Sequence, residues 1–271
     1  MKRSKLTLLA MFFFGCTEPT VPISQNESQL RPRFDLAAAA NEAVLPSAYS
    51  AMMGETNNNF PHSQRNLRYQ QVFMGSDVVD STIVGVCLRR DELFGGSSIT
   101  QTVTIRLGPT SLDYTNLANS FDGNYSAPPT EVFTGDIVVP ASAADGTPAD
   151  FDLCIPFTQS YEHPSGSNVI IEFVNTSLAS SGRARDACGG EVSLCTTARA
   201  FAFSATAANA ALVARGGLVM KFISPEPPPP VEPVTADDCK QGGWADFGFK
   251  NQGQCIRFIE TGLDSRLENV S

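Results

Sequence analysis

Histidine is scarce in this chain, and the short motifs of common catalytic sites are missing. Only two of the 271 residues are His, namely His62 and His163. No G-x-S-x-G, H-E-x-x-H or phosphate-binding P-loop pattern occurs. General-base chemistry at neutral pH relies mostly on imidazole, and His163 precedes Pro164 within a turn sequence, which favours a surface turn residue. The sequence therefore identifies no catalytic residue and favours a non-enzymatic protein.

Signatures of metals, cofactors and nucleic acid are also missing. The seven Cys include no C-x2-C pair, and with two His this argues against the usual zinc sites. We therefore expect no metal and no cofactor. Asp and Glu outnumber Lys and Arg by 28 to 19, and the net charge is −9. An acidic chain is a poor match for nucleic acid or anionic lipid, so we interpret the charge as a solubility feature.

The first residues have the pattern of an export signal. Positive charges lie at Lys2, Arg3 and Lys5. Residues 6–14 form an apolar run too short to span a bilayer, and Gly15-Cys16 follows it. The end of this apolar run, at Gly15-Cys16, resembles a bacterial lipobox, which predicts a signal peptide over residues 1–15 and a lipidated Cys16. Two phenylalanines before Gly15 depart from the lipobox, so ordinary secretion is the alternative to a membrane-anchored lipoprotein of the cell envelope.

Six cysteines remain if Cys16 carries lipid, and an even number suits disulfides outside the cytoplasm. Two expected pairs are local in sequence, Cys188 with Cys195 and Cys239 with Cys255. Cys87 and Cys154 remain, and each lies on the polar face of a predicted strand. Fifteen connectivities are possible in principle, and these three pairs are the ones we predict.

Alternating apolar residues predict an all-β fold. In residues 151–157, Phe151, Leu153, Ile155 and Phe157 share one face, and a turn sequence at residues 163–167 leads to a denser apolar run. Eight such strands fit a jelly-roll-like sandwich of two four-stranded sheets. The expected strands lie at residues 68–73, 81–90, 99–107, 131–139, 151–157, 169–174, 196–206 and 216–223.

Helical spacing appears at two places before the C-terminal part. Residues 111–121 place apolar side chains at helical intervals after Ser111, a possible N-cap, and predict a short helix over one end of the sandwich. Residues 34–45 are rich in Ala and suggest a helical turn within a polar tether.

Consecutive prolines mark the clearest boundary of the chain, because they favour a stiff polyproline II segment. A module of about 30 residues follows, too small to fold without a staple. Thr235 and Asn251 are possible N-caps for two helices, and Gly262 can end the second. Trp244 is expected in the miniature core, with sugar stacking as the alternative. The predicted parts are a signal peptide (1–15), a lipid-anchored tether (16–67), a β-sandwich (68–223), a Pro-rich linker (224–234) and a Cys-stapled tail module (235–271).

Two resemblances follow from these motifs. The order from RYQQVF (68–73) through Val132-Phe133-Thr134-Gly135 to residues 161–168 resembles an uncharacterised exported β-sandwich domain of bacterial PEP-CTERM-type surface proteins. The chain lacks that family's C-terminal Pro-Glu-Pro sorting helix and carries extra cysteines. The segment CKQGGWADFGFKNQGQC (239–255) is similar to a Cys-Lys-x-Gly-Gly-Trp motif at the ends of exported bacterial proteins, which carries no agreed activity.

Acidic side chains leave two further hypotheses open. Glu131 with Asp136, or Asp150 with Asp152, could form a glycosidase pair, although exposed strand faces carry acids routinely. Asp145-Gly146 and Asp150 could contribute to a calcium site, although a solvated turn is the favoured interpretation. Glycosylation patterns at Asn26, Asn124 and Asn175 are treated as chance matches.

From these features the sequence predicts an envelope lipoprotein with a non-enzymatic interaction or structural module. Its membrane attachment would come from lipid, and an envelope glycan or protein would be its partner. A carbohydrate-binding or carbohydrate-cleaving sandwich is the alternative. Aromatic side chains lined up over a groove would favour glycan binding, and two facing carboxylates would favour cleavage.

Overall fold

The computed structural model describes residues 41–62, 64–78, 81–141, 143, 150–178, 184–225 and 232–265. The predicted signal peptide, Cys16 and the first part of the predicted tether lie outside these residues. Within the described ranges no helix has both the length and the apolar character needed to cross a membrane.

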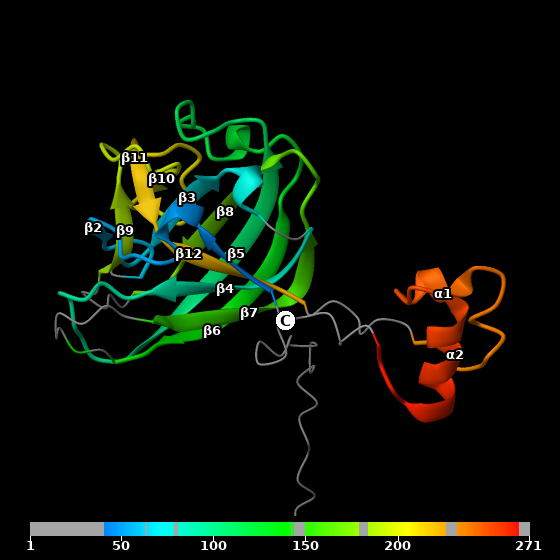
Figure 1. The fold of residues 1–271 in the computed structure, drawn as a ribbon. Helices are drawn as coiled ribbons and strands as arrows, with labels where there is room; N and C mark the ends of the chain where they lie inside the picture. The colour runs from blue at the N-terminus through cyan, green and yellow to red at the C-terminus, as the bar shows by residue number, and fades with distance from the viewer. Residues whose placement is uncertain are drawn as a thin grey trace, which may run out of the picture. The chain divides into compact units, whose positions relative to one another are not determined.

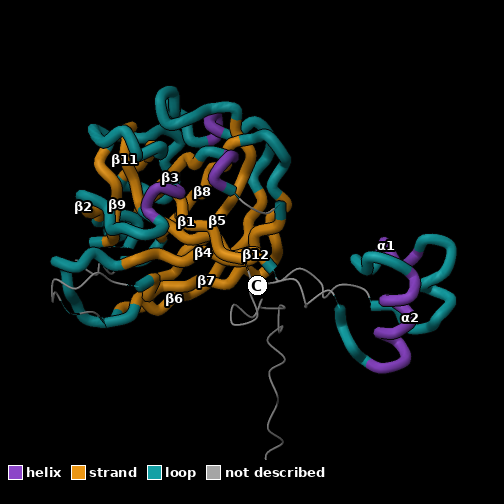
Figure 2. Tube along the Cα trace, viewed as in Figure 1, coloured by secondary structure: helices purple, strands orange, loops and turns teal. Residues whose placement is uncertain are grey.

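The described part of the chain is mostly β, with two antiparallel sheets packed as a sandwich (Figures 1 and 2). The smaller sheet has the order β1-β12-β4-β7 and the larger one β2-β9-β11-β10-β3-β8-β5-β6. The expectation of two four-stranded sheets was therefore wrong, since the described strands form sheets of four and eight. The strands are β1 (Asn41–Leu45), β2 (Thr56–Asn58), β3 (Leu67–Phe73), β4 (Thr82–Arg89), β5 (Ile99–Thr110), β6 (Thr130–Val139), β7 (Phe151–Glu162), β8 (Asn168–Asn175), β9 (Arg185–Gly189), β10 (Ala198–Ala202), β11 (Leu212–Leu218) and β12 (Met220–Ser224).

The sandwich begins earlier than the sequence indicated. β1 pairs with β12, Leu45 opposite Met220, and β2 pairs with β9. Residues 41–62 and 64–67 therefore belong to the sandwich and not to a tether, and the last part of the Ala-rich stretch is a strand. These strands were missed because they have five and three residues, too few to show an alternating pattern.

One predicted strand is divided between the two sheets. Residues 216–223 were expected as a single strand, but β11 ends at Leu218 in the larger sheet and β12 begins at Met220 in the smaller one. The backbone N–H of Val219, between them, donates to the carbonyl of Asp186. The chain thus crosses from one sheet to the other within a continuous apolar run, whose pattern shows no break.

Residues 111–121 are turns instead of the predicted helix, and a short 3-10 helix, η4 (Asp122–Asn124), follows. The backbone N–H of Leu112 donates to Thr110 Oγ1, and that of Thr115 to Asp113 Oδ1. Such local bonds compete with helical ones. Residues 111–129, the covering segment (green at the top of Figure 1), pack Leu117 and Phe121 over the outer face of the larger sheet, beside Val72, Ile170 and Ala200.

The main core lies between the sheets and follows the predicted alternation. Leu153, Ile155 and Phe157 of β7 are buried in it, as expected. Phe151 is the exception, because the β4–β7 pairing shifts register there and the ring packs on the opposite face. Other members include Tyr69, Phe73, Ile83, Val103, Ile105, Val132, Ile171, Phe173 and Phe222. Two further 3-10 helices are η2 (Ser47–Tyr49) and η3 (Gly75–Asp77).

The tail contains α1 (Gly243–Asp246) and α2 (Gln252–Thr261), and the Cys239–Cys255 disulfide links α2 to the turn before α1. The predicted ends of the second helix are confirmed, since Asn251 caps α2 and Gly262 ends it in a left-handed conformation. Thr235 does not cap a helix. The carboxylate of Asp238 instead accepts from the backbone N–H of Thr235, 2.7 Å away, and turns follow up to α1.

Candidate functional site

A buried carboxylate organises the outer face of the larger sheet. Glu172 on β8 has a fully buried side chain and accepts hydrogen bonds from three neighbours. Arg68 Nε is 2.9 Å away, Gln70 Nε2 2.7 Å and Arg106 Nη1 3.0 Å. The strand register brings these side chains together, because Gln70 and Arg106 are the Cα partners of Glu172 on the two adjacent strands. A buried carboxylate that is shielded from water is stable in its charged form only when such hydrogen-bond donors and cations surround it.

The covering segment closes over this cluster. Arg68 Nη2 contacts Asp122 Oδ1 at 2.7 Å, and its guanidinium carbon lies 4.6 Å from the ring centre of Phe121. Asn124 Nδ2 donates to Gln70 Oε1 at 3.0 Å. This network was not predicted from the sequence. Its only sequence signal is a charged residue within the otherwise apolar β8.

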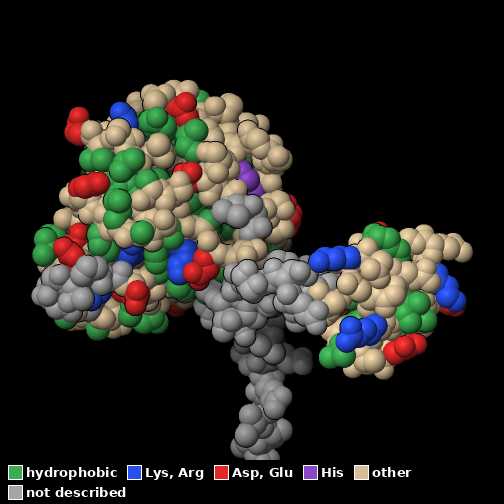
Figure 3. Space-filling view, viewed as in Figure 1, with side chains coloured by type: hydrophobic (Ala, Val, Ile, Leu, Met, Phe, Trp, Pro, Cys, Tyr) green, Lys and Arg blue, Asp and Glu red, His purple; other side chains and the backbone are tan. Residues whose placement is uncertain are grey.

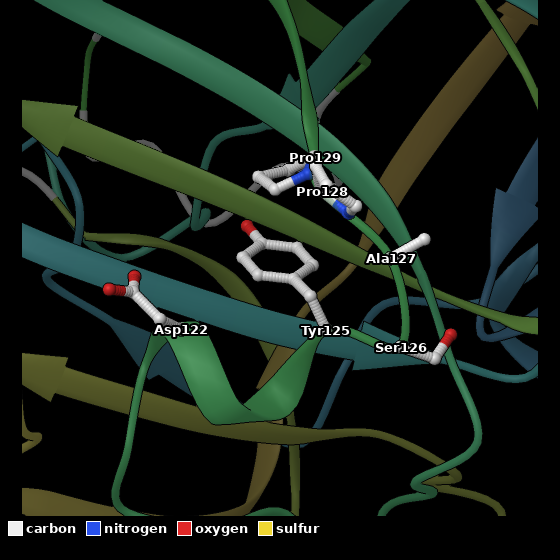
Figure 4. A pocket seen from close by; sticks show the side chains of 6 residues that line it. All are labelled: Asp122, Tyr125, Ser126, Ala127, Pro128 and Pro129. Atoms are coloured by element: carbon white, nitrogen blue, oxygen red, sulfur yellow. The ribbon is translucent and has the colours of Figure 1, made fainter.

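Beside the network lies a hollow of about 340 Å³ in the covering segment (Figure 4). Tyr125 forms its floor, and β5 approaches it so closely that a Cβ on Gly108 would lie 2.6 Å from the ring. Burial and the charge of Glu172 raise the pKa of the Tyr125 hydroxyl, so it stays protonated. The lining residues are Asp122, Tyr125, Ser126, Ala127, Pro128 and Pro129.

This hollow has the chemistry of a binding surface. An aromatic ring and two prolines offer apolar faces, while Asp122 and Ser126 offer polar groups at the rim. A sugar ring presents the same combination of C–H faces and hydroxyls. Among the described residues that line the hollow, Asp122 is the one carboxylate, so they provide no pair of acids for glycoside cleavage.

Both histidines are buried. His62 lies 3.2 Å from Gln101 Oε1, and burial lowers the pKa of His62 to about 3, with the charge of Arg185 acting in the same direction. His163 lies before the predicted turn, which Ser167 N–H closes on Pro164 O. Its side chain was expected at the surface, but the residue is only 8% exposed and burial lowers its pKa. Both imidazoles therefore favour the neutral form.

The candidate acid pairs are held by neighbouring side chains. Thr102 donates to Asp136 Oδ1 at 2.6 Å, while Glu131 accepts from Thr134 and lies 3.5 Å from Arg106. Asp152 forms an ion pair with the buried Arg185. Asp145 and Gly146 of the calcium hypothesis lie outside the described residues, and the described ones contain no cluster of three His, Cys, Asp or Glu placed for a metal.

Two glycosylation patterns have structural explanations. Asn124 is 1% exposed and binds the carbonyl of Ala118 as well as Gln70, and Asn175 is fully buried with its amide on the carbonyl of Pro61. Neither side chain is accessible to a glycosylating enzyme. Asn26 lies outside the described residues.

The six cysteines form three disulfides, Cys87–Cys154, Cys188–Cys195 and Cys239–Cys255, which are the pairs that the sequence predicts. Three disulfides indicate an extracytoplasmic protein. Trp244 is partly buried and packs on the small core of Cys239, Phe249 and Cys255 in the tail.

In comparisons with known proteins, no protein-family model, curated protein or solved structure matches the chain. What the observations define is a class: a two-sheet β-sandwich protein with three disulfides.

Proposed function

We propose that the chain is a lipoprotein of the bacterial cell envelope, and that its jelly-roll-like sandwich serves as a non-enzymatic interaction or structural module. The export pattern before Gly15-Cys16 and the three disulfides support this location. The resemblance to exported PEP-CTERM-type sandwich domains points the same way.

The observation that carries the non-enzymatic part is the state of the polar side chains. The two imidazoles are buried with lowered pKa values, and Glu172 is held between two guanidinium groups. Groups in this state stabilise the fold and are not available for proton transfer to a substrate. On the face of the sandwich drawn in Figure 3, acidic and basic side chains are scattered and form no single-sign patch. A protein or glycan partner therefore suits the surface better than a polyanion.

Attachment is tested by mass spectrometry and fractionation. The native protein should carry a diacylated or triacylated Cys16 at its N-terminus and should sediment with membranes. A Cys16→Ala variant should lose the lipid and move to the soluble fraction. An N-terminus cut elsewhere, with an unmodified Cys16, would contradict the lipid anchor and favour ordinary secretion.

Glycan binding is a second candidate, favoured by the hollow around Tyr125. Its apolar floor and polar rim suit a neutral sugar, and its single carboxylate favours binding over cleavage. A glycan array with the native protein should then give specific signals that Ala127→Arg abolishes, because the new side chain would fill the hollow. Ala141→Arg adds the same charge at another exposed position and is the matched control. Equal loss in both variants, or signals unaffected by either, would contradict a sugar site here.

A further inference from the structure

The six disulfide-bonded cysteines differ sharply in exposure. Cys188, Cys195, Cys239 and Cys255 are fully buried, and Cys87 is 2% exposed. Cys154 alone among these six is an exposed residue. Since exchange requires a thiolate to reach a disulfide sulfur, accessibility selects Cys154 as the first point of attack.

The position of Cys154 leaves room for an incoming thiol. β7 is the last strand of the smaller sheet and β6 the last of the larger one, so both have a free edge. Between them lies a hollow of about 300 Å³. Its lining consists of Asp136, Ile137 and Val138 of β6 and Leu153, Cys154 and Ile155 of β7. This volume suits a small thiol compound.

The leaving sulfur, that of Cys87, lies in a different environment. Cys87 packs with Val84 and Ile223 beside Phe151, and Lys221 is its Cα partner on β12. The ammonium of Lys221 lies 4.8 Å from the ring centre of Phe151. Burial disfavours a thiolate at Cys87, whereas Lys221, whose ammonium also pairs with Glu42 at 2.8 Å, places a cation on the adjacent strand that favours one. Attack on Cys154 expels Cys87 Sγ, the other sulfur of the bond.

We propose that Cys154 is a thiol-exchange site for low-molecular-weight thiols. A thiolate attacks Cys154 Sγ and forms a new S–S bond there, while the Cys154–Cys87 bond breaks. Its electron pair goes to Cys87 Sγ, which leaves as a thiolate and then takes a proton from water according to its pKa. The product is a mixed disulfide on Cys154 and a thiol at Cys87, with no external oxidant required.

The charge of the hollow selects among such thiols. Asp136 is the one charged residue among the described residues of its lining, and it repels an anionic thiol while attracting a cationic one. Cysteamine is therefore the better probe, and 3-mercaptopropionate the poorer one. Asp136→Asn should narrow the difference in rate between these thiols. Glu131→Gln removes one charge from the same strand outside the hollow and is the matched control.

The experiment treats the full native chain with cysteamine, quenches with acid, and maps adducts by peptide mass spectrometry. The adduct should form on Cys154, with Cys87 as the free thiol, at least about tenfold faster than either other disulfide opens. Lys221→Gln should slow the reaction about three- to tenfold, and Lys221→Arg, which keeps the charge, should not. In urea, where burial is lost, the preference for Cys154 should disappear.

Several results would overturn the proposal. An adduct on Cys87, or opening of Cys188–Cys195 or Cys239–Cys255 at the same rate in the native protein, would show that exposure does not govern exchange. If Asp136→Asn keeps its near-ultraviolet circular dichroism and the ratio of the rates for cysteamine and 3-mercaptopropionate does not change, the thiol does not bind in this hollow. If no adduct forms at any cysteamine concentration that leaves the protein folded, Cys154 is not a thiol-exchange site.

Discussion

At the scale of single residues, the sandwich is distinguished by charged and polar side chains that are buried on both faces of the larger sheet. Glu172 lies on its outer face under the covering segment, whereas His62 and Gln101 are buried elsewhere in the sandwich. Each has the hydrogen bonds described above. Buried polar groups with satisfied partners specify one arrangement of strands, because any slip in register would leave them unpaired.

Glu172→Gln tests the outer network. The substitution leaves the guanidinium groups of Arg68 and Arg106 beside a neutral amide in a water-poor place, and we expect the free energy of unfolding to fall by about 3 kcal/mol. Denaturant unfolding measures this. Glu131→Gln is the control, because its side chain is 50% exposed and its ion pair with Arg106 spans 3.5 Å, so a loss of less than about 1 kcal/mol is expected. Equal losses would show that burial does not set the strength of the network.

His62 predicts how stability depends on pH. Its folded pKa of about 3 lies below the value of about 6.5 in an unfolded chain. Between these values the unfolded chain binds a proton that the folded chain does not, so stability is lost as pH falls through this window, by up to about 1.4 kcal/mol per pH unit. His62→Gln should flatten this part of the pH profile, measured by thermal unfolding. An unchanged slope in a folded His62→Gln variant would contradict the assignment.

At the scale of elements, short polar segments determine where strands and helices begin. The covering segment became turns because Thr110 and Asp113 bind nearby backbone N–H groups. In the tail, by contrast, Asn251 stands at a helix start, and its Oδ1 accepts from Gln254 N–H at 3.0 Å. The same kind of local bond can therefore prevent one helix and initiate another.

Asn251→Ala should loosen α2. Loss of the cap leaves a backbone N–H without its partner and costs about 1 kcal/mol of helix stability. Amide hydrogen exchange over Gln252–Thr261 should speed up about fivefold at this energy. Asn251→Asp keeps an acceptor oxygen and should leave exchange near its original rate. Equal exchange in both variants would mean that tertiary packing alone holds the helix.

At the scale of the whole molecule, the tail is predicted to be an independent appendage. Its small core consists of tail residues, with Trp244, Phe247 and Phe258 packed around the disulfide. Truncation after Ser224 keeps β12 and should leave the melting temperature of the sandwich within about 4 °C, or on the order of 1 kcal/mol. Trp244→Ala in the full chain should expose Cys239 and Cys255 to reductant without affecting the sandwich. A larger drop on truncation would mean that the tail docks on the sandwich.

The sequence by itself determined the class of fold, the three disulfide pairs and the ends of α2. These features follow from period-2 alternation, from cysteine spacing and parity, and from caps that act within four residues. Most of these signals are local, and the distant Cys87–Cys154 pair follows once the two local pairs are assigned, so they need no knowledge of the fold.

Only the tertiary structure decided which strands share a sheet, where β11 gives way to β12, and that residues 41–62 and 64–67 are part of the sandwich. The tertiary structure also decided the Arg68–Glu172–Arg106 cluster and the exposure of Cys154. In both cases the strands that pair, β3 and β5 with β8 and β4 with β7, lie far apart in sequence. Pairing between distant strands depends on the packing of the whole chain, since short strands such as β2 carry no pattern of their own.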